Sequence, residues 1–216
     1  MLQVSANEVY QTARKACLAA GYLQDRAEDV ALASSWLHYA GFNGCGELER
    51  MLAAEMEENL TARTKLHLHV DNACLHITRL RPAYEGIAAI DWMLACSNSA
   101  QVRIDKILHP LMVAGLLWRS GLIYQKQFRL EADGLSSAVL IPDIMAGRLA
   151  EISALSDRVV IWPDKDISMQ MSAPSGPCKM DKQIWQSLNS LAAQTYVPET
   201  ESSRLSGAGA GLVDND

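Results

Sequence analysis

The first quarter of the chain constrains the fold most, because its pattern predicts three helices in close succession. Ser5 and Glu8 have the S-x-x-E spacing of a capping box, in which each side chain binds a backbone N–H of the first helical turn. Small apolar residues then recur at helical spacing in two stripes across residues 9–37. A glycine-rich break at 41–46 precedes a third helix from about Glu47. Because alanine-rich faces let helices approach closely, we expect a tight antiparallel pair within a helical head.

The remainder of the chain shows strand and helix patterns in mixed order. Residues 65–70 alternate strictly between polar and apolar side chains, and 73–80 continue in an extended pattern, which predicts a hairpin. Residues 111–118 are apolar on all sides, so a helix there is expected in the core or at a subunit interface. Residues 180–195 predict a closing helix. This order favours an α+β fold, with a head of about three helices packed on a mixed or antiparallel sheet with further helices.

We therefore divide the chain into a helical head at 1–60, an α+β body at 61–197 and a glycine-rich C-terminal tail at 198–216. The glycines at 207–211 form neither a dinucleotide fingerprint nor a phosphate-binding loop, since no strand precedes them and the lysine is missing. Successive glycine amides can form an anion-binding nest. The composition of the segment favours a tail that is flexible or lies on the surface.

Charge and cysteine usage exclude several functional classes. The net charge is −6 and no cluster of lysine and arginine is present, so neither a nucleic acid nor an anionic membrane is expected as a partner. The five cysteines are scattered without a C-x-x-C pair, and no signal peptide is evident, which predicts reduced thiols in the cytoplasm. The longest apolar run, at 111–118, is far shorter than the ~20 residues of a membrane span.

Four side chains that can bind a metal lie on the predicted hairpin, namely His67, His69, Cys74 and His76. If the loop consists of residues 71–72, His69 lies opposite Cys74 and His67 lies opposite His76, all on one face. Opposed residues have Cβ atoms ~4.5–5.5 Å apart, which is close enough to share a transition metal ion.

A three-residue loop instead places His76 opposite Leu68 and disperses this set, and the turn residues do not decide between the two registers. The competing interpretation is a polar, partly solvated sheet face, or histidines that pack under a helix. No other cofactor is predicted.

Cys45 is a candidate nucleophile, because it lies between two glycines just before a helix, and a helix N-terminus stabilises a thiolate. A nucleophilic cysteine also needs a positioned base, and His38 lies one to two turns before it. The competing interpretation is a small residue in a tight turn. The tryptophans are dispersed, and we interpret them as core or interface residues, not as a stacking platform: Trp36, Trp92, Trp118, Trp162 and Trp185.

Residues 4–21 and the segment Ala-Gly-Phe-Asn-Gly-Cys-Gly at 40–46 resemble the N-terminal segment of the type-2 malate/L-lactate dehydrogenase family. That family has a helix pair followed by R-G-x-D-S-H-G, whose Asp and His belong to the active site. This chain carries Asn43 and Cys45 at the matching places. The resemblance therefore implies that the proton-relaying imidazole is missing, and we expect no hydride transfer between nicotinamide cofactors and 2-hydroxy acids.

The whole chain is more similar to a bacterial family known only as a domain of unknown function. This resemblance rests on the N-terminal helices, on the His-Pro-Leu segment at 109–111 and on the ending at 203–216. It implies no activity.

Two classes of function follow from these observations. The first is a non-catalytic binding or accessory protein that forms a homo-oligomer through helix 110–118 or the alanine-rich head, or that binds a small molecule. The alternative is a small-molecule enzyme, either metal-assisted at the hairpin histidines or a degenerate relative of the dehydrogenases. Whether the protein is an enzyme is left open by the sequence.

Overall fold

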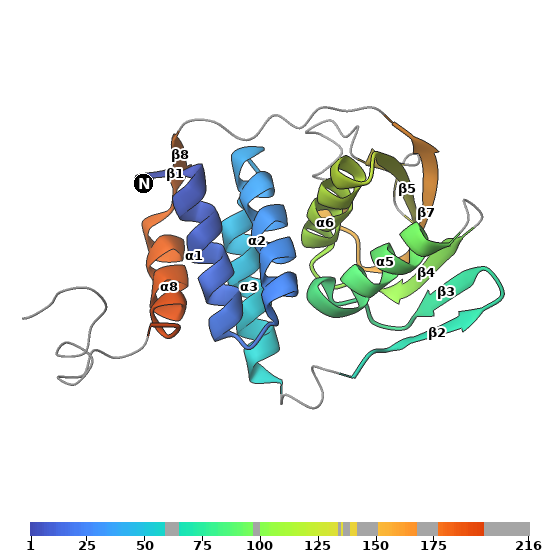
Figure 1. The fold of residues 1–216 in the computed structure, drawn as a ribbon, viewed down its shortest axis with the longest axis horizontal. Coiled ribbons are helices and arrows are strands. Elements are labelled where there is room, and N and C mark those ends of the chain that lie inside the picture. Colours follow the sequence, from blue (N-terminus) through green and yellow to red (C-terminus); the bar gives the residue numbers. More distant parts are fainter. Residues whose placement is uncertain are drawn as a thin grey trace, which may run out of the picture.

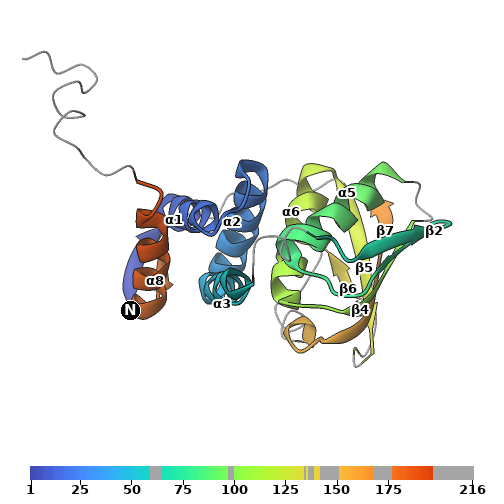
Figure 2. The ribbon, with the colours of Figure 1, turned by 90° about the horizontal axis from the view of Figure 1, so that it is seen from below.

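The computed structural model describes residues 1–58, 65–96, 100–133, 135, 139–141, 151–167 and 177–196. The described elements form a helical head, a middle layer of helices and a six-stranded sheet, arranged side by side in Figure 1. Viewed from below, the middle layer covers one face of the sheet, and the head lies on the far side of that layer (Figure 2). The predicted tail at 198–216 lies outside the described residues.

The head contains the three predicted helices, α1 (Ala6–Ala19), α2 (Gln24–Tyr39) and α3 (Gly44–Glu57). The capping box is present, since the Ser5 hydroxyl accepts from the Glu8 N–H and the Glu8 carboxylate accepts from the Ser5 N–H at 2.8 Å. The small residues of both stripes are buried, which gives α1 and α2 their close contact: Ala13, Ala16, Ala27 and Ala31. The prediction of an alanine-rich helical head is confirmed.

The body contains a mixed sheet with the strand order β2-β3-β4-β7-β5-β6. β3 pairs with β4 in parallel, and the other neighbours pair antiparallel. The predicted α+β class is therefore confirmed. The strands are β2 (Leu68–Asp71), β3 (Cys74–Ile77), β4 (Gln101–Lys106), β5 (Lys126–Ala132), β6 (Val139–Ile141) and β7 (Asp157–Asp166). Their apolar side chains build the core against the helices: Leu75, Ile77, Val102, Ile104, Phe128, Leu130, Val159 and Ile161.

The middle layer consists of a π-helical turn η1 (Pro82–Gly86), α5 (Ile87–Ala95) and α6 (Pro110–Ile123). α6 contacts α2 on one side and β5 and β6 on the other, so its apolar surface is buried within the chain. Gly115 permits the contact with the head, since a Cβ there would lie 3.1 Å from the Ala33 Cβ. The all-round apolar pattern of 111–118 is thus explained by burial between two layers.

The chain returns to the head at its end. β8 (Pro177–Met180) pairs antiparallel with β1 (Leu2–Ser5), and α8 (Lys182–Ala193) packs against α1 and α3. Asp181 caps α8 by accepting from the Gln183 and Ile184 N–H groups. The sequence division placed this segment in the body at 61–197, whereas the structure places it beside the first helix (Figure 1). None of the described helices has the length and apolar character needed to cross a membrane.

The predicted hairpin is present, but both registers considered from the sequence are wrong. Asp71 extends the first strand and pairs with Cys74, so the loop is Asn72-Ala73. Asn72 adopts a left-handed φ of 53°, a conformation that asparagine tolerates better than most residues and that a tight turn requires. As a result His69 lies opposite His76, not opposite Cys74, and His67 lies beside Thr78, whose N–H it binds through its carbonyl.

A buried ion pair joins the body to the head at the start of the middle layer. Arg81 is 1% exposed and Glu85 is 0% exposed. The guanidinium donates to both carboxylate oxygens, at 2.6 and 2.9 Å, and the carboxylate also accepts from the His67 N–H at 3.1 Å. The Arg81 guanidinium further binds the Lys65 carbonyl at 2.8 Å and lies 3.8 Å from Glu58 at the end of α3. One side chain therefore ties the hairpin entry, the π-helical turn and the head together.

A second polar contact between these layers is made by His109, the residue before α6. Its Nδ1 lies 3.0 Å from the Glu47 carboxylate in the first turn of α3, and Arg50 pairs with the other oxygen of Glu47. His109 has a left-handed φ of 49°, which is a strained conformation before a proline. The bond to Glu47 holds this residue in place and connects the starts of the two helices.

We predict that Leu117→Ala lowers the free energy of unfolding by ~2–5 kcal/mol, because Leu117 is 0% exposed and its removal leaves a cavity. Urea denaturation at neutral pH measures this change. The control is Ile123→Ala at the end of the same helix, where the side chain is 48% exposed and a loss of only about 0.5 kcal/mol is expected. Equal losses in the two variants would contradict the buried placement of α6.

We also predict that Glu85→Gln destabilises the protein by about 3–5 kcal/mol, because it removes the carboxylate charge that lies directly against the buried Arg81 and leaves only the more distant Glu58. Burial favours a raised pKa for Glu85, but its hydrogen bonds to Arg81 prevail and lower the pKa. The stabilisation is therefore present above the ordinary carboxyl pKa and is lost as the pH falls through the lowered value. The control is Glu28→Gln, at an exposed carboxylate paired with Arg14, where urea denaturation is expected to show a loss of about 1 kcal/mol or less.

Candidate functional site

Cys45 lies at the start of α3 as predicted, but its environment suppresses thiol chemistry. The side chain is fully buried, and this burial raises the pKa of the Cys45 thiol to about 12, although a hydrogen bond with Ser34 acts in the opposite direction. Gly44 explains the glycine-rich break, because a Cβ there would lie 2.1 Å from the Ser34 carbonyl oxygen. The small residues thus allow α2 and α3 to pack closely.

His38 lies near the end of α2, and its Nε2 donates to the Lys179 carbonyl at 3.1 Å. The pKa of His38 is lowered by burial, partly offset by this hydrogen bond. Its Nδ1 is buried, and none of the described residues forms a hydrogen bond with it. The imidazole therefore joins α2 to β8, and this bond gives it a structural role in closing the head.

Asn43, which stands where the dehydrogenase family has its aspartate, also has a local structural role. It adopts a left-handed φ of 47° as the N-cap of α3, and its Oδ1 accepts from the Gly46 N–H at 3.3 Å. The side chain satisfies a backbone donor that the first helical turn leaves free.

The hairpin brings two of the four predicted metal ligands face to face. The rings of His69 and His76 stack with their centres 4.9 Å apart and their planes at 10°. Cys74 lies opposite Asp71, and His67 lies two residue pairs beyond the His69–His76 pair, beside Thr78. Within the described ranges, no three His, Cys, Asp or Glu side chains are grouped so that they could hold a metal ion. The metal site at His67, His69, Cys74 and His76 stays a prediction, with a changed pairing.

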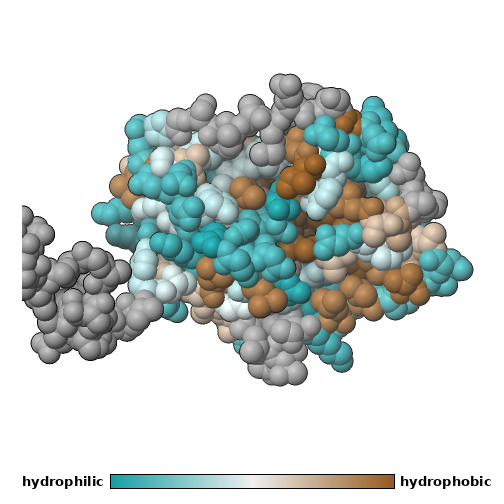
Figure 3. Space-filling model, in the orientation of Figure 1, coloured by the Kyte–Doolittle hydropathy of each residue, from teal (hydrophilic) through white to brown (hydrophobic). Residues whose placement is uncertain are grey.

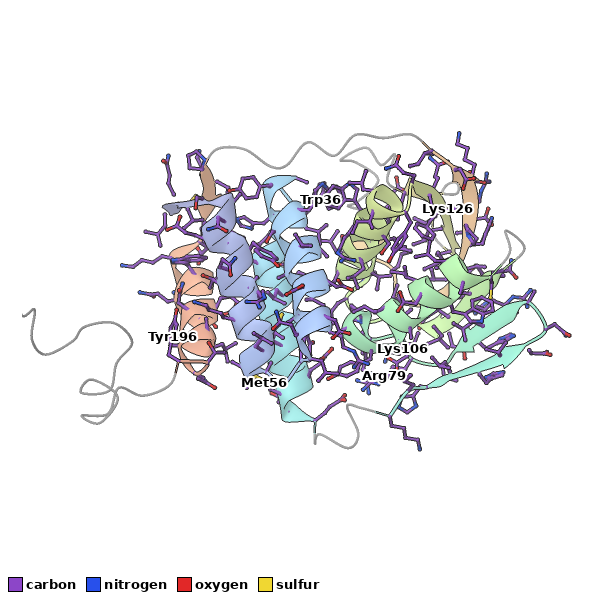
Figure 4. All side chains as sticks on the ribbon, in the orientation of Figure 1. Trp36, Met56, Arg79, Lys106, Lys126 and Tyr196 are labelled. Carbon is purple, nitrogen blue, oxygen red and sulfur yellow. The ribbon has the colours of Figure 1, made fainter. Side chains whose placement is uncertain are left out.

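A cavity of about 230 Å³ lies between α1, α2 and α6, and none of these candidates lines it. Its wall contains Trp36 and Trp118, whose rings stack with centres 4.0 Å apart and planes at 15°. Hydrophobic residues reach the surface between α2 and α6 in Figure 3, and Figure 4 labels Trp36 at this place. The lining is completed by Ala6, Asn7, Tyr10, Leu32, Ser35, Tyr39, Arg119 and Ile123.

The stack of tryptophans follows from how closely α2 and α6 approach. Gly115 packs on Ala33, and each tryptophan lies three residues, or about one helical turn, after one of these small residues. The contact of small residues therefore sets the helix separation, and the next turn places the two indoles against each other. The interpretation of Trp36 and Trp118 as core residues is confirmed, since both pack against the core, but the two are not dispersed, because their rings stack on each other.

The polar residues of the lining are Tyr10, Tyr39 and Arg119, together with Asn7 and Ser35. Burial, together with the charge of Glu28, raises the pKa of Tyr10, and burial with a Cys178 hydrogen bond raises that of Tyr39 to about 12. Both phenols therefore stay protonated at neutral pH, and the hydroxyl of Tyr39 is engaged with Cys178. Arg119 is fixed from behind by Asp29, with Nη2 and Oδ1 2.6 Å apart. The site thus combines flat apolar walls with a few donors, as is typical of small-molecule sites.

Comparison with known proteins gives a family similarity over less than half of the chain and no activity. Residues 4–101 match the model of a family described as protein of unknown function (DUF3726), which agrees with the resemblance found in the sequence. No curated protein matches the chain. Among solved structures, the chain is weakly similar to malate dehydrogenase from Entamoeba histolytica, with 10% identity and a TM-score of 0.45. This likeness covers 60% of the present chain and 38% of that enzyme, so the chain spans less than two fifths of it.

We predict that Cys45 does not react with thiol reagents in the folded protein, because it is buried and its pKa is raised. The exposed Cys96 is the internal control and should be labelled rapidly at pH 8. Peptide mass spectrometry after a short pulse of iodoacetamide separates the two sites, and labelling of Cys45 should require urea. Labelling of both cysteines at similar rates without denaturant would show that Cys45 is an accessible nucleophile.

Proposed function

We propose that this protein is a non-catalytic binding protein that holds a small, flat and mainly apolar molecule in the cavity beside the Trp36–Trp118 stack. The observation that carries the proposal is the lining itself, in which two stacked indoles and two phenols surround about 230 Å³. Aromatic faces bury large areas and add stacking energy of about 0.5–1.5 kcal/mol per pair. The volume is below the ~300–1,000 Å³ of typical ligand pockets and suits a one- or two-ring molecule.

The chemistry of the other candidates supports binding over catalysis. Cys45 is a buried thiol with a raised pKa, and His38 uses its Nε2 on a backbone carbonyl. Neither of these residues lines the aromatic cavity. The lining of the cavity therefore supports ligand binding, whereas Cys45 and His38, which were first considered for catalysis, are not part of it.

Self-association stays a prediction. The two surfaces first considered for it are buried by contacts within the chain. α6 is buried between the head and the sheet, and the alanine stripes of α1 and α2 are buried within the head. We therefore expect self-association to involve exposed residues and not these buried stripes. No feature of the aromatic cavity specifically supports the alternative that the protein is an enzyme.

The proposal is tested with three matched two-ring probes, naphthalene-2-carboxamide, naphthalene-2-carboxylate and 2-(aminomethyl)naphthalene. At least one probe is expected to bind saturably, with a stoichiometry near one, in isothermal titration calorimetry. Trp36→Ala should weaken this binding about tenfold, because the stacking wall is lost. The matched control is Trp185→Ala on α8, outside the cavity, which should bind like the wild type. The proposal fails if no probe binds, or if the two variants weaken binding equally.

A further inference from the structure

We propose that a polar cavity between α2, α5 and α6 is a second binding site, and that it binds a small primary ammonium ion. The cavity has a volume of about 190 Å³. Arg119 lines both this cavity and the aromatic one. The other residues of its lining do not belong to the aromatic cavity, so this inference goes beyond the proposed function: Asp29, Ile87, Ile90, Asp91, Leu116, Ser120 and Tyr124.

The charge of this lining favours a cation. Asp29 on α2 and Asp91 on α5 contribute two carboxylates, whereas Arg119 on α6 contributes one guanidinium. With both carboxylates ionised, the lining carries one negative charge in excess. Burial and the charge of Asp25 raise the pKa of Asp91, although Arg119 acts in the opposite direction. A bound cation would offset the excess charge that makes Asp91 harder to ionise.

Ser120 gives an argument that does not depend on charge. It is only 5% exposed and lies in the lining of the cavity. Helical serines often donate to a carbonyl one turn earlier, as Ser35 does to Ala31 at 2.7 Å. The Ser120 hydroxyl has no such bond, nor any other hydrogen bond to a residue that the structure describes. A nearly buried hydroxyl without a partner is costly, and a ligand N–H in the cavity would satisfy it.

The acceptors of the cavity match the three N–H donors of a primary ammonium ion. The Oδ1 of Asp29 binds Nη2 of Arg119 at 2.6 Å, and a carboxylate has about four acceptor positions, so Asp29 can accept a further bond. Within the described ranges, Asp91 forms neither an ion pair nor a hydrogen bond. Together with Ser120, these groups place three acceptors from three helices around one small space.

Other ions fit this lining less well. An anion would meet two carboxylates, and the one guanidinium already pairs with Asp29. A divalent metal such as Ca²⁺ takes about six to eight oxygen ligands. Here the lining offers two carboxylates, and the Arg119 charge repels a dication more strongly than a monocation. Asp91 and Tyr124 are exposed, so a short alkyl body can extend past them while the ammonium group lies inside.

The experiment compares n-propylammonium, propan-1-ol and tetramethylammonium. Propan-1-ol has the same alkyl body without the charge, and tetramethylammonium has the charge without an N–H donor. Each is titrated into isotope-labelled protein at neutral pH and constant ionic strength, and the backbone amide shifts are followed by NMR. We expect n-propylammonium to bind saturably, with the largest shifts near Asp91 and Ser120, and at least about tenfold tighter than either other probe.

Two variants each remove one acceptor. Asp91→Asn and Ser120→Ala should each weaken n-propylammonium binding at least about threefold. Asp105→Asn is the matched control, because Asp105 is an exposed carboxylate on β4 that does not line the cavity. Trp36→Ala is the second control and should leave n-propylammonium binding unchanged, since Trp36 lines the aromatic cavity and not this one. The amide spectra show directly whether each variant is folded.

The comparison of the three probes on the wild-type protein does not depend on any variant. The inference is wrong if propan-1-ol or tetramethylammonium binds as tightly as n-propylammonium, or if n-propylammonium causes no saturable shift. Equal losses in Asp91→Asn and Asp105→Asn would indicate a general charge effect and reject the site. Equal losses in Asp91→Asn and Trp36→Ala would place the ion in the aromatic cavity and also reject it. The naphthalene probes test the proposed function separately, so the failure of one proposal is distinguishable from that of the other.

Discussion

A guanidinium and a carboxylate that leave water together each lose several kcal/mol of hydration, and only close and multiple hydrogen bonds offset that loss. Arg81 and Glu85 meet this condition through two side-chain hydrogen bonds, and Glu85 also accepts from the backbone N–H groups of Arg81 and His67. The pair fixes the π-helical turn from which α5 continues, and through Glu58 it reaches the end of α3. The pair thus helps to place the middle layer between sheet and head, together with the His109–Glu47 contact and the packing of Gly115 on Ala33.

Local patterns predicted the elements of the fold, because they depend on residues close in sequence. The capping box at Ser5 and the apolar periodicity of α1 and α2 are examples. In the hairpin, local patterns predicted the two strands but not the register in which they pair. Residues 71–72 and 72–73 both offer a turn, and the structure uses the second because Asn72 takes the left-handed conformation while Asp71 pairs in the ladder. The packing of α8 against the head could not be predicted either, because the pattern of a helix does not show which distant part of the chain it packs against.

The candidate site was missed for the same reason. Trp36 and Trp118 lie in different thirds of the chain, and neither has neighbours in sequence that mark it as part of a cavity. The signal that could have joined them is the small residue one turn before each, Ala33 and Gly115, which permits a close helix crossing. Cys45 and the hairpin histidines were easier to notice, because reactive residue types stand out in a sequence, whereas an aromatic wall becomes visible only when helices are packed.

The pairing of β1 with β8 has a consequence for folding during synthesis on the ribosome. Ser5 and its partner Pro177 are about 170 residues apart, so at about 5–20 residues per second synthesis takes roughly ten to thirty seconds to supply the second strand. Throughout that interval β1 lacks its partner strand, and the face of α1 that α8 later covers meets solvent or the chaperones that bind exposed apolar surface. β1 therefore leaves the ribosome long before the strand that pairs with it, which makes completion of the head a late event in synthesis.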